Sequence, residues 1–266
     1  MTDIHPTAIV ADGAQLGVGV VVGPYSIVGA HVELGDGVVL YSHAVIEGRT
    51  KIGAGGSVYP FAVIGHRPQD TKYDGEPSTL VVGERCTIRE HVTMHPGTIR
   101  GDMITEVGDD CLMMVGAHVA HDCRIGDNVI MANNASLGGH VVIDDHAILG
   151  GMVAVHQFVR IGRHAMIGGA SAVDADIIPY GSVSGDRAHL LGLNLVGLKR
   201  RGFGNEEIHA LQKAYLMLFG SEGTLQDRLD DVADSYASND LISDIVRFAR
   251  ADSHRPICQP RNNRGG

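Results

Sequence analysis

At 266 residues, the chain can hold one large domain or two modest ones. Its net charge of −10 argues against general nucleic-acid binding, which needs a basic face. No apolar run approaches the roughly 18 residues that a membrane span requires, and no secretory signal opens the chain. A cytoplasmic protein is therefore expected. Glycine is abundant (36 residues) and aromatic residues are scarce (5 %), which favours a repetitive, turn-rich architecture.

An aliphatic residue recurs every six positions along the first two thirds of the chain. The pattern runs from Ile4 to Ile64, resumes at Val82, and continues after a one-residue slip from Val107 to Val173. A six-residue unit is too short for a pair of helices and too regular for a β-sandwich. It predicts a mainly β fold, a parallel β-helix in which short strands stack coil upon coil.

A second column, four residues after each aliphatic position, holds small or β-branched residues. Cys86, Cys111 and Cys123 fall in this column, which predicts small interior side chains rather than metal ligands or nucleophiles. The four cysteines form neither a CxxC pair nor a disulfide-like framework.

Two segments interrupt the repeat and are predicted to be loops. Residues 70–81 span two repeats and keep the phase, whereas residues 100–106 shift it by one. Loops on a rigid scaffold often carry binding groups, so Asp70 and Lys72 are candidates for substrate binding. The alternative for both is a solvated charge.

The repeat ends near Pro179, and helical periodicity replaces it after a glycine-rich connector. We expect helices over residues 205–218, 224–236 and 241–249, with Asn205 and Thr224 as N-caps. The predicted domains are therefore a β-helix over 1–180 and a small helical domain over 181–266. The polar tail from Asp252 on is expected to be disordered.

The repeat resembles that of the hexapeptide-repeat transferases, which implies a left-handed β-helix with eighteen residues per coil. Residues eighteen apart then lie above one another at about 4.8 Å. This places His121, Gly139 and Gln157 in one column and Asp122 with His140 in the next. Four histidines lie outside both inward columns and should point outward: His118, His121, His140 and His156.

This polar cluster has the residue types of an acyl-transfer site. A histidine such as His121 is a natural general base near neutral pH, and Asp122 can orient it. The bare backbone N–H of Gly139 suits an oxyanion. Because no serine or cysteine has a convincing setting as a nucleophile, direct attack by an activated acceptor is favoured. Surface histidines without a role are the alternative, since the chain has fifteen.

The chain as a whole resembles the UDP-N-acetylglucosamine acyltransferase family, which catalyses the first step of lipid A synthesis. The resemblance rests on runs that a generic hexapeptide protein lacks: QDTKYDGEP, AHVAHDC, MANNASLGGHV, GGMVAVHQFVRIG and GLNLVGLKRRGF. It implies a homotrimer with sites between neighbouring β-helices. The implied reaction moves a (3R)-3-hydroxyacyl group from acyl carrier protein to the 3-hydroxyl of UDP-N-acetylglucosamine, without metal or cofactor.

The resemblance also implies roles for single residues. His121 matches the general base, Asp122 its partner and Gly139 the oxyanion donor. Five residues match family positions that contact the sugar or lie near it: Asp70, Lys72, His118, His140 and Gln157. Three residues match family positions that hold the nucleotide and its phosphates: Asn194, Arg200 and Arg201. Gly169 matches the position that limits acyl length, where a glycine leaves the groove long.

One departure and several alternatives accompany this resemblance. Val196 stands where the family often has glutamate near the nucleotide, which puts that contact in doubt. The N-acyltransferases of the same pathway carry an additional N-terminal domain, for which a repeat starting at Ile4 leaves no room. A γ-type carbonic anhydrase fits the spacing of His118 and His121 poorly, and a purely structural β-helix would not explain the polar column. The 3-amino sugar remains an alternative acceptor.

Overall fold

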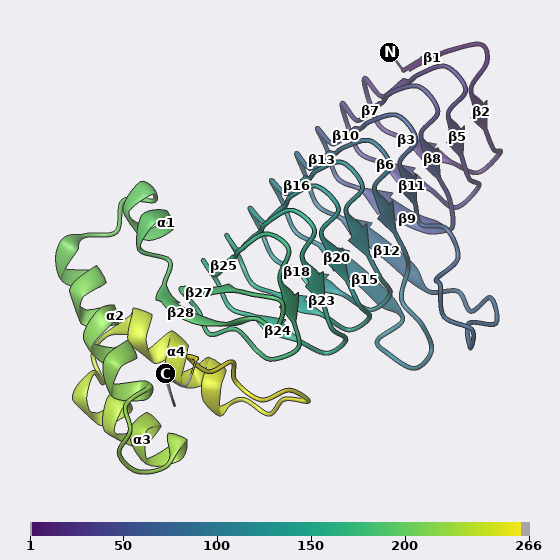
Figure 1. Ribbon diagram of the computed structural model, residues 1–266. Helices are drawn as coiled ribbons and strands as arrows, with labels where there is room; N and C mark the ends of the chain where they lie inside the picture. Colours follow the sequence, from purple (N-terminus) through teal and green to yellow (C-terminus); the bar gives the residue numbers. More distant parts are fainter. Residues whose placement is uncertain (1, 262–266) are drawn as a thin grey trace.

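The computed structural model describes residues 2–261 and contains a left-handed parallel β-helix followed by four α-helices (Figure 1). The β-helix is the long prism coloured purple to teal, and the helices, green to yellow, gather beyond its last coils. The expected fold class is thereby confirmed. No helix within residues 2–261 is long and apolar enough to cross a membrane.

Three sheets form the walls of the prism, and consecutive strands step from one wall to the next. The first sheet contains β1 (Asp3–Ile4), β4 (Val21–Val22), β7 (Val39–Leu40), β10 (Ser57–Val58), β13 (Thr87–Ile88), β16 (Leu112–Met113), β19 (Ile130–Met131), β22 (Ile148–Leu149), β25 (Met166–Ile167), β27 (Gly181–Ser184) and β28 (His189–Leu193). The second contains β2 (Ile9–Val10), β5 (Ile27–Val28), β8 (Val45–Ile46), β11 (Val63–Ile64), β14 (Thr93–Met94), β17 (His118–Val119), β20 (Ser136–Leu137), β23 (Ala154–Val155) and β26 (Ala172–Val173). The third contains β3 (Gln15–Leu16), β6 (Glu33–Leu34), β9 (Arg49–Ile52), β12 (Thr79–Val82), β15 (Ile104–Val107), β18 (Arg124–Ile125), β21 (Val142–Ile143) and β24 (Arg160–Ile161).

The strand register gives the expected coil of eighteen residues. Val21 pairs with Val39, and His118 pairs with Ser136. The two predicted loops lengthen single coils: Ser57 pairs with Thr87 across the first, and Thr87 pairs with Leu112 across the second. Both loops connect the second sheet to the third, so both leave the prism at one corner (Figure 1).

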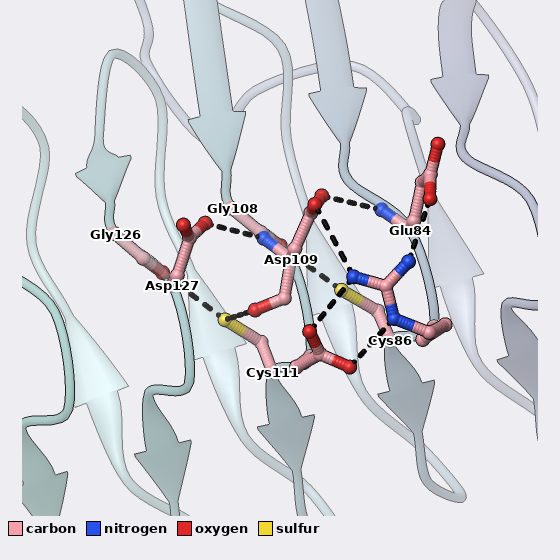
Figure 2. A network of polar contacts seen from close by, with 9 residues as sticks. Glu84, Cys86, Gly108, Asp109, Cys111, Gly126 and Asp127 are labelled. Atoms are coloured by element: carbon pink, nitrogen blue, oxygen red, sulfur yellow. Dashed lines mark hydrogen bonds and ion pairs between the residues drawn. The ribbon is translucent and has the colours of Figure 1, made fainter.

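The two inward columns form the core of the prism, as the hexad pattern predicted. Cys86 and Cys111 are almost fully buried, and their thiols donate to the carbonyl oxygens of Gly108 and Gly126, each at 3.1 Å (Figure 2). Asp109 lies beside them and accepts the backbone N–H of Glu84 at 2.7 Å. The cysteines therefore satisfy backbone groups inside the coil and belong to its packing.

The segment that follows the β-helix is more structured than the sequence predicted. The connector contains the antiparallel pair β27 and β28 and the short helix α1 (Leu195–Arg200), which Asn194 caps. The three expected helices are α2 (Asn205–Leu218), α3 (Leu225–Ser235) and α4 (Asp240–Arg250). Thr224 caps α3 as predicted, whereas Asn205 is the first helical residue and Gly204 is the N-cap of α2.

The expectation of a disordered tail from Asp252 on is wrong for residues 252–261, which pack against the β-helix. Ile257 forms a β-bridge with Asp176, and Pro260 forms one with Leu190. Cys258 is only 3 % exposed. The prediction for residues 262–266 lies outside the described residues.

Candidate active site

The central feature of the site is an imidazole–carboxylate pair on neighbouring residues. Nδ1 of His121 lies 2.8 Å from Oδ2 of Asp122. Asp122 is the second residue of the turn between β17 and β18 and has a positive φ of 59°. The Asp122 side chain is 2 % exposed and the His121 side chain 13 %, so the imidazole is the member of the pair that a substrate can reach.

Asp122 is held by groups that sequence reasoning missed. The backbone N–H of Thr98 donates to Oδ1 at 3.0 Å, and the Thr98 hydroxyl donates to Oδ2 at 2.7 Å. The hydroxyl of Thr105 accepts the Asp122 N–H at 2.8 Å. Gly101 closes over the carboxylate so tightly that a Cβ there would lie 2.3 Å from its Cγ.

These hydrogen bonds keep Asp122 ionised and select the tautomer of a neutral His121. Burial by itself would raise the pKa of Asp122, but the hydrogen bonds from His121 and Thr98 outweigh it and hold the pKa below its usual value. Asp122 is therefore a carboxylate near neutral pH and can only accept. His121 must donate from Nδ1, which leaves the lone pair on Nε2 as a proton acceptor.

Gly139 lies one coil beyond His121, close to its ring. A Cβ on Gly139 would lie 2.6 Å from Nε2 of His121, so only glycine leaves room for the imidazole. The Gly139 N–H has no hydrogen-bond partner in the described chain, although the neighbouring amides of Gly138 and His140 both have one. A free backbone donor thus lies next to the histidine, as the stacking of the two residues predicted.

His140 stacks above Asp122, also as predicted. Its Nε2 lies 3.9 Å from Oδ2 of Asp122, and its ring meets that of His121 edge-on. Burial lowers the pKa of His140 against the opposing effect of the Asp122 charge. His121, Asp122 and His140 offer ligand atoms within 4.8 Å of one another, close enough for a cation. Both Asp122 oxygens and Nδ1 of His121 are already hydrogen-bonded, which fits a base and its orienting group better than a metal centre.

His118 lies on the outward side of β17, as expected, and is half-buried there. Its Nδ1 lies 2.8 Å from the Thr93 hydroxyl, and burial, with a smaller contribution from His95, lowers its pKa to about 4. His95 itself is buried at 5 % exposure and was not predicted. Its Nδ1 donates to the His66 carbonyl at 2.9 Å, while Nε2 has no partner in the described chain.

Three of the other predicted residues lie on a different wall of the β-helix. Asn194, Arg200 and Arg201 line a cavity of 820 Å³ on the first sheet. Asn194 is anchored there by donating to the His164 carbonyl at 3.0 Å, and Arg201 by donating to the His146 carbonyl at 2.9 Å. Val196 lines the same cavity and is 62 % exposed, so an apolar side chain faces it.

Asp70 and Lys72 lie on the first loop, at the same corner as His121. Oδ1 of Asp70 accepts the Lys72 N–H at 2.9 Å, and neither side chain bonds to the His121 pair in the described chain. The two loops touch where Glu76 accepts the Ile99 N–H at 3.1 Å. Gln157 is exposed, one coil beyond Gly139, and its backbone N would lie 2.9 Å from a Cβ on Gly138.

Gly169 lies at a different corner, between β25 and β26, and is exposed. A Cβ on Gly169 would lie 3.2 Å from the carbonyl oxygen of Gly151, which lies one coil earlier. Two bare glycines on successive coils leave a smooth patch of backbone there.

The chain is similar to known proteins over almost its whole length. Residues 176–258 match a family model described as UDP N-acetylglucosamine O-acyltransferase, domain 2, and residues 104–139 match one for six bacterial transferase hexapeptide repeats. The acyl-[acyl-carrier-protein]–UDP-N-acetylglucosamine O-acyltransferase of Bartonella henselae is 47 % identical over 98 % of this chain and 95 % of its own. The enzyme of the same name from Caulobacter vibrioides is 56 % identical over 74 % of each chain. The structure of UDP-N-acetylglucosamine acyltransferase from Campylobacter jejuni superposes with a TM-score of 0.92 at 38 % identity, over 97 % of this chain and all of its own.

Proposed function

The chain belongs to the family of acyl-[acyl-carrier-protein]–UDP-N-acetylglucosamine O-acyltransferases, and we infer that it transfers an acyl group from acyl carrier protein to UDP-N-acetylglucosamine in lipid A biosynthesis. The finer statement that we propose is transfer of a (3R)-3-hydroxyacyl group to the 3-hydroxyl of the sugar. The observation that carries the chemistry is the His121–Asp122 pair with the free N–H of Gly139 beside it.

In the proposed mechanism, His121 acts as general base through Nε2. The sugar hydroxyl loses its proton to Nε2 while its oxygen attacks the thioester carbonyl of the acyl donor. The imidazolium that forms keeps its Nδ1–H on the ionised Asp122, which stabilises the positive charge. His121 then returns the proton to the departing thiolate as the C–S bond breaks, so no acyl group is ever attached to the protein.

The N–H of Gly139 stabilises the oxyanion in this proposal. The tetrahedral intermediate carries a negative oxygen, and a donor that is fixed beforehand lowers its energy without reorganisation. Gly139 supplies such a donor because its amide is unpaired in the described chain and no side chain covers it.

We propose that the complete site forms between copies of the chain in a homotrimer. The catalytic pair lies at the corner between the second and third sheets, the Asn194 cavity on the first sheet, and Gly169 at the corner between the first and second. One protomer cannot bring three walls of a prism to a single substrate. A neighbour that turns its first sheet towards the catalytic corner can do so.

Mixed assembly tests this arrangement. His121→Ala and Asn194→Ala variants are each expected to be inactive, whereas trimers assembled from both should regain activity at sites that combine two unaltered residues. The absence of any regain in verified mixed trimers would contradict a shared site.

The substrate is tested by assay of the wild-type protein with UDP-N-acetylglucosamine and a panel of 3-hydroxyacyl carrier proteins, with products weighed by mass spectrometry. A product heavier by one 3-hydroxyacyl group is expected, and a panel without product would refute the proposal. Metal analysis of the purified protein tests the metal-free mechanism, because stoichiometric zinc would contradict it. The cytoplasmic location expected from the sequence stays a prediction.

A further inference from the structure

The C-terminal segment of residues 252–261, called here the strap, returns from α4 to the last coils of the β-helix. Its backbone is bound by Asp176, whose N–H donates to the Pro256 carbonyl at 2.8 Å and whose carbonyl accepts the Cys258 N–H at 2.8 Å. Further along, Gln259 accepts the Leu190 N–H at 3.0 Å. Three backbone hydrogen bonds therefore fix the course of the strap.

A buried carboxylate fixes the start of the strap as well. Asp176 has no exposed surface. Its Oδ2 accepts from Arg160 Nε at 2.7 Å and from the Ser253 hydroxyl at 2.6 Å, and its Oδ1 accepts the Arg160 N–H at 2.8 Å. A buried charge with several donors is costly to disrupt, so Ser253 holds the two residues after it in a defined position.

Those two residues, His254 and Arg255, reach the coil that follows Gly139. Nε of Arg255 donates to the Gln157 carbonyl at 3.0 Å, and its NH2 group contacts Nδ1 of His156. A guanidinium can only donate, so His156 accepts at Nδ1 in this contact. One arginine thus contacts both the backbone carbonyl of Gln157 and the side chain of His156.

His254 extends the contact to the catalytic cluster. Its ring lies 4.8 Å from that of Phe158, which stacks on His140 with 4.5 Å between centroids and 4° between planes. His140 in turn meets His121 and approaches Asp122. The Phe158 N–H donates to the Gly139 carbonyl at 3.1 Å, so this coil also packs on the proposed oxyanion donor.

We propose that the strap is part of the acceptor-binding site and that Arg255 is a positioning residue for UDP-N-acetylglucosamine. Arg255 acts through Gln157 and His156, and His254 acts through Phe158 and His140. This inference rests on the proposed function, because it assigns the strap to the same site and substrate. It gives the C-terminal residues a role beyond closing the end of the β-helix.

The test compares Arg255→Gln, Arg255→Lys and, as a matched control, Arg247→Gln on the exposed face of α4, where Arg247 is 74 % exposed. Kinetic constants for UDP-N-acetylglucosamine and for the acyl donor are measured together with the melting temperature. A charged donor to a carbonyl typically contributes enough to change an affinity about tenfold. Arg255→Gln should raise KM for UDP-N-acetylglucosamine by about that factor and leave KM for the acyl donor unchanged. Arg255→Lys should recover part of the loss.

Two results would overturn the proposal. One is an Arg255→Gln variant with wild-type constants. The other is a lower melting temperature with reduced kcat and unchanged KM, which is the pattern of a structural role alone. Hydrogen exchange of residues 153–160 gives a readout that needs no turnover: faster exchange in Arg255→Gln than in Arg247→Gln supports the coupling, and equal exchange contradicts it. Failure of the proposed function would instead appear as an inactive wild-type protein.

Discussion

A Cβ atom on Gly139 would lie 2.6 Å from Nε2 of His121, so a side chain at residue 139 and the imidazole compete for one space on successive coils. The backbone of Gly139 is at the same time the free donor beside the base. The two residues therefore define the site together, and neither can be changed without affecting the other.

Gly139→Ala is expected to displace the His121 ring from Asp122 and to lower kcat by about 10²-fold, a loss comparable to that of an oxyanion donor. Steady-state assay measures the effect. Gly29→Ala is the matched control, since the nearest atom to a Cβ there is the Glu47 Cα at 3.3 Å. A Gly139→Ala variant with wild-type kcat would contradict the requirement for a fixed position of the His121 ring beside Gly139.

Thr98→Val removes the hydroxyl that donates to Oδ2 of Asp122 at 2.7 Å. That hydrogen bond helps to hold the pKa of Asp122 low, so its loss raises the pKa towards the ordinary value. Because Asp122 must be ionised to orient His121, activity should decline at a higher pH than in wild type, and kcat should fall by roughly tenfold. A pH–rate profile checks both, and Thr98→Ser should restore them. If the acidic side of the pH–rate profile of Thr98→Val coincides with that of wild type, the Thr98 hydroxyl does not hold the pKa of Asp122 low.

Stability should decrease as the pH falls from 6.5 towards 4. Burial lowers the pKa of both His118 and His164 to about 4, from an ordinary value of 6.5. Between these values the unfolded chain binds more protons than the folded one, so the free energy of unfolding falls with decreasing pH. Each histidine contributes up to about one bound proton to that slope. Denaturant titrations at fixed protein concentration and several pH values measure the slope.

His164→Gln should flatten that slope, whereas His209→Gln, an exposed position on α2, should not. Equal slopes in wild type and His164→Gln would contradict the assignment of the acid sensitivity to buried histidines.

Gly169→Met is expected to shift preference towards shorter acyl donors. A Cβ there would lie 3.2 Å from the Gly151 carbonyl, so a side chain can be accommodated only by extending along the exposed surface. Competition between long and short 3-hydroxyacyl donors, read by mass spectrometry, gives the selectivity. An unchanged product distribution would remove Gly169 as the gauge of acyl length.

The sequence predicted the parts of the molecule that repeat. The hexad period fixes which residues point inward, and the coil of eighteen residues that the family resemblance implied places His121 beside Gly139. Thr98 was missed because it lies in the loop that breaks the phase, and Thr105 was missed because it lies in β15, directly after that loop. The packing of the strap was not predicted because its composition is polar and because Asp176, which binds it, lies far away in sequence. The sequence did not predict that Asn194 and His121 lie far apart on one protomer, because it does not show which wall of the β-helix carries each residue.

The most direct test of the account is the turnover of His121→Ala with UDP-N-acetylglucosamine and a 3-hydroxyacyl carrier protein. Folding and oligomeric state should be preserved, because the His121 side chain contributes only its contacts with Asp122 and its neighbours at the surface of the coil. Loss of the general base is expected to reduce kcat by on the order of 10²-fold or more. An intact His121→Ala protein that turns over at near-wild-type rate would contradict the mechanism proposed for this site.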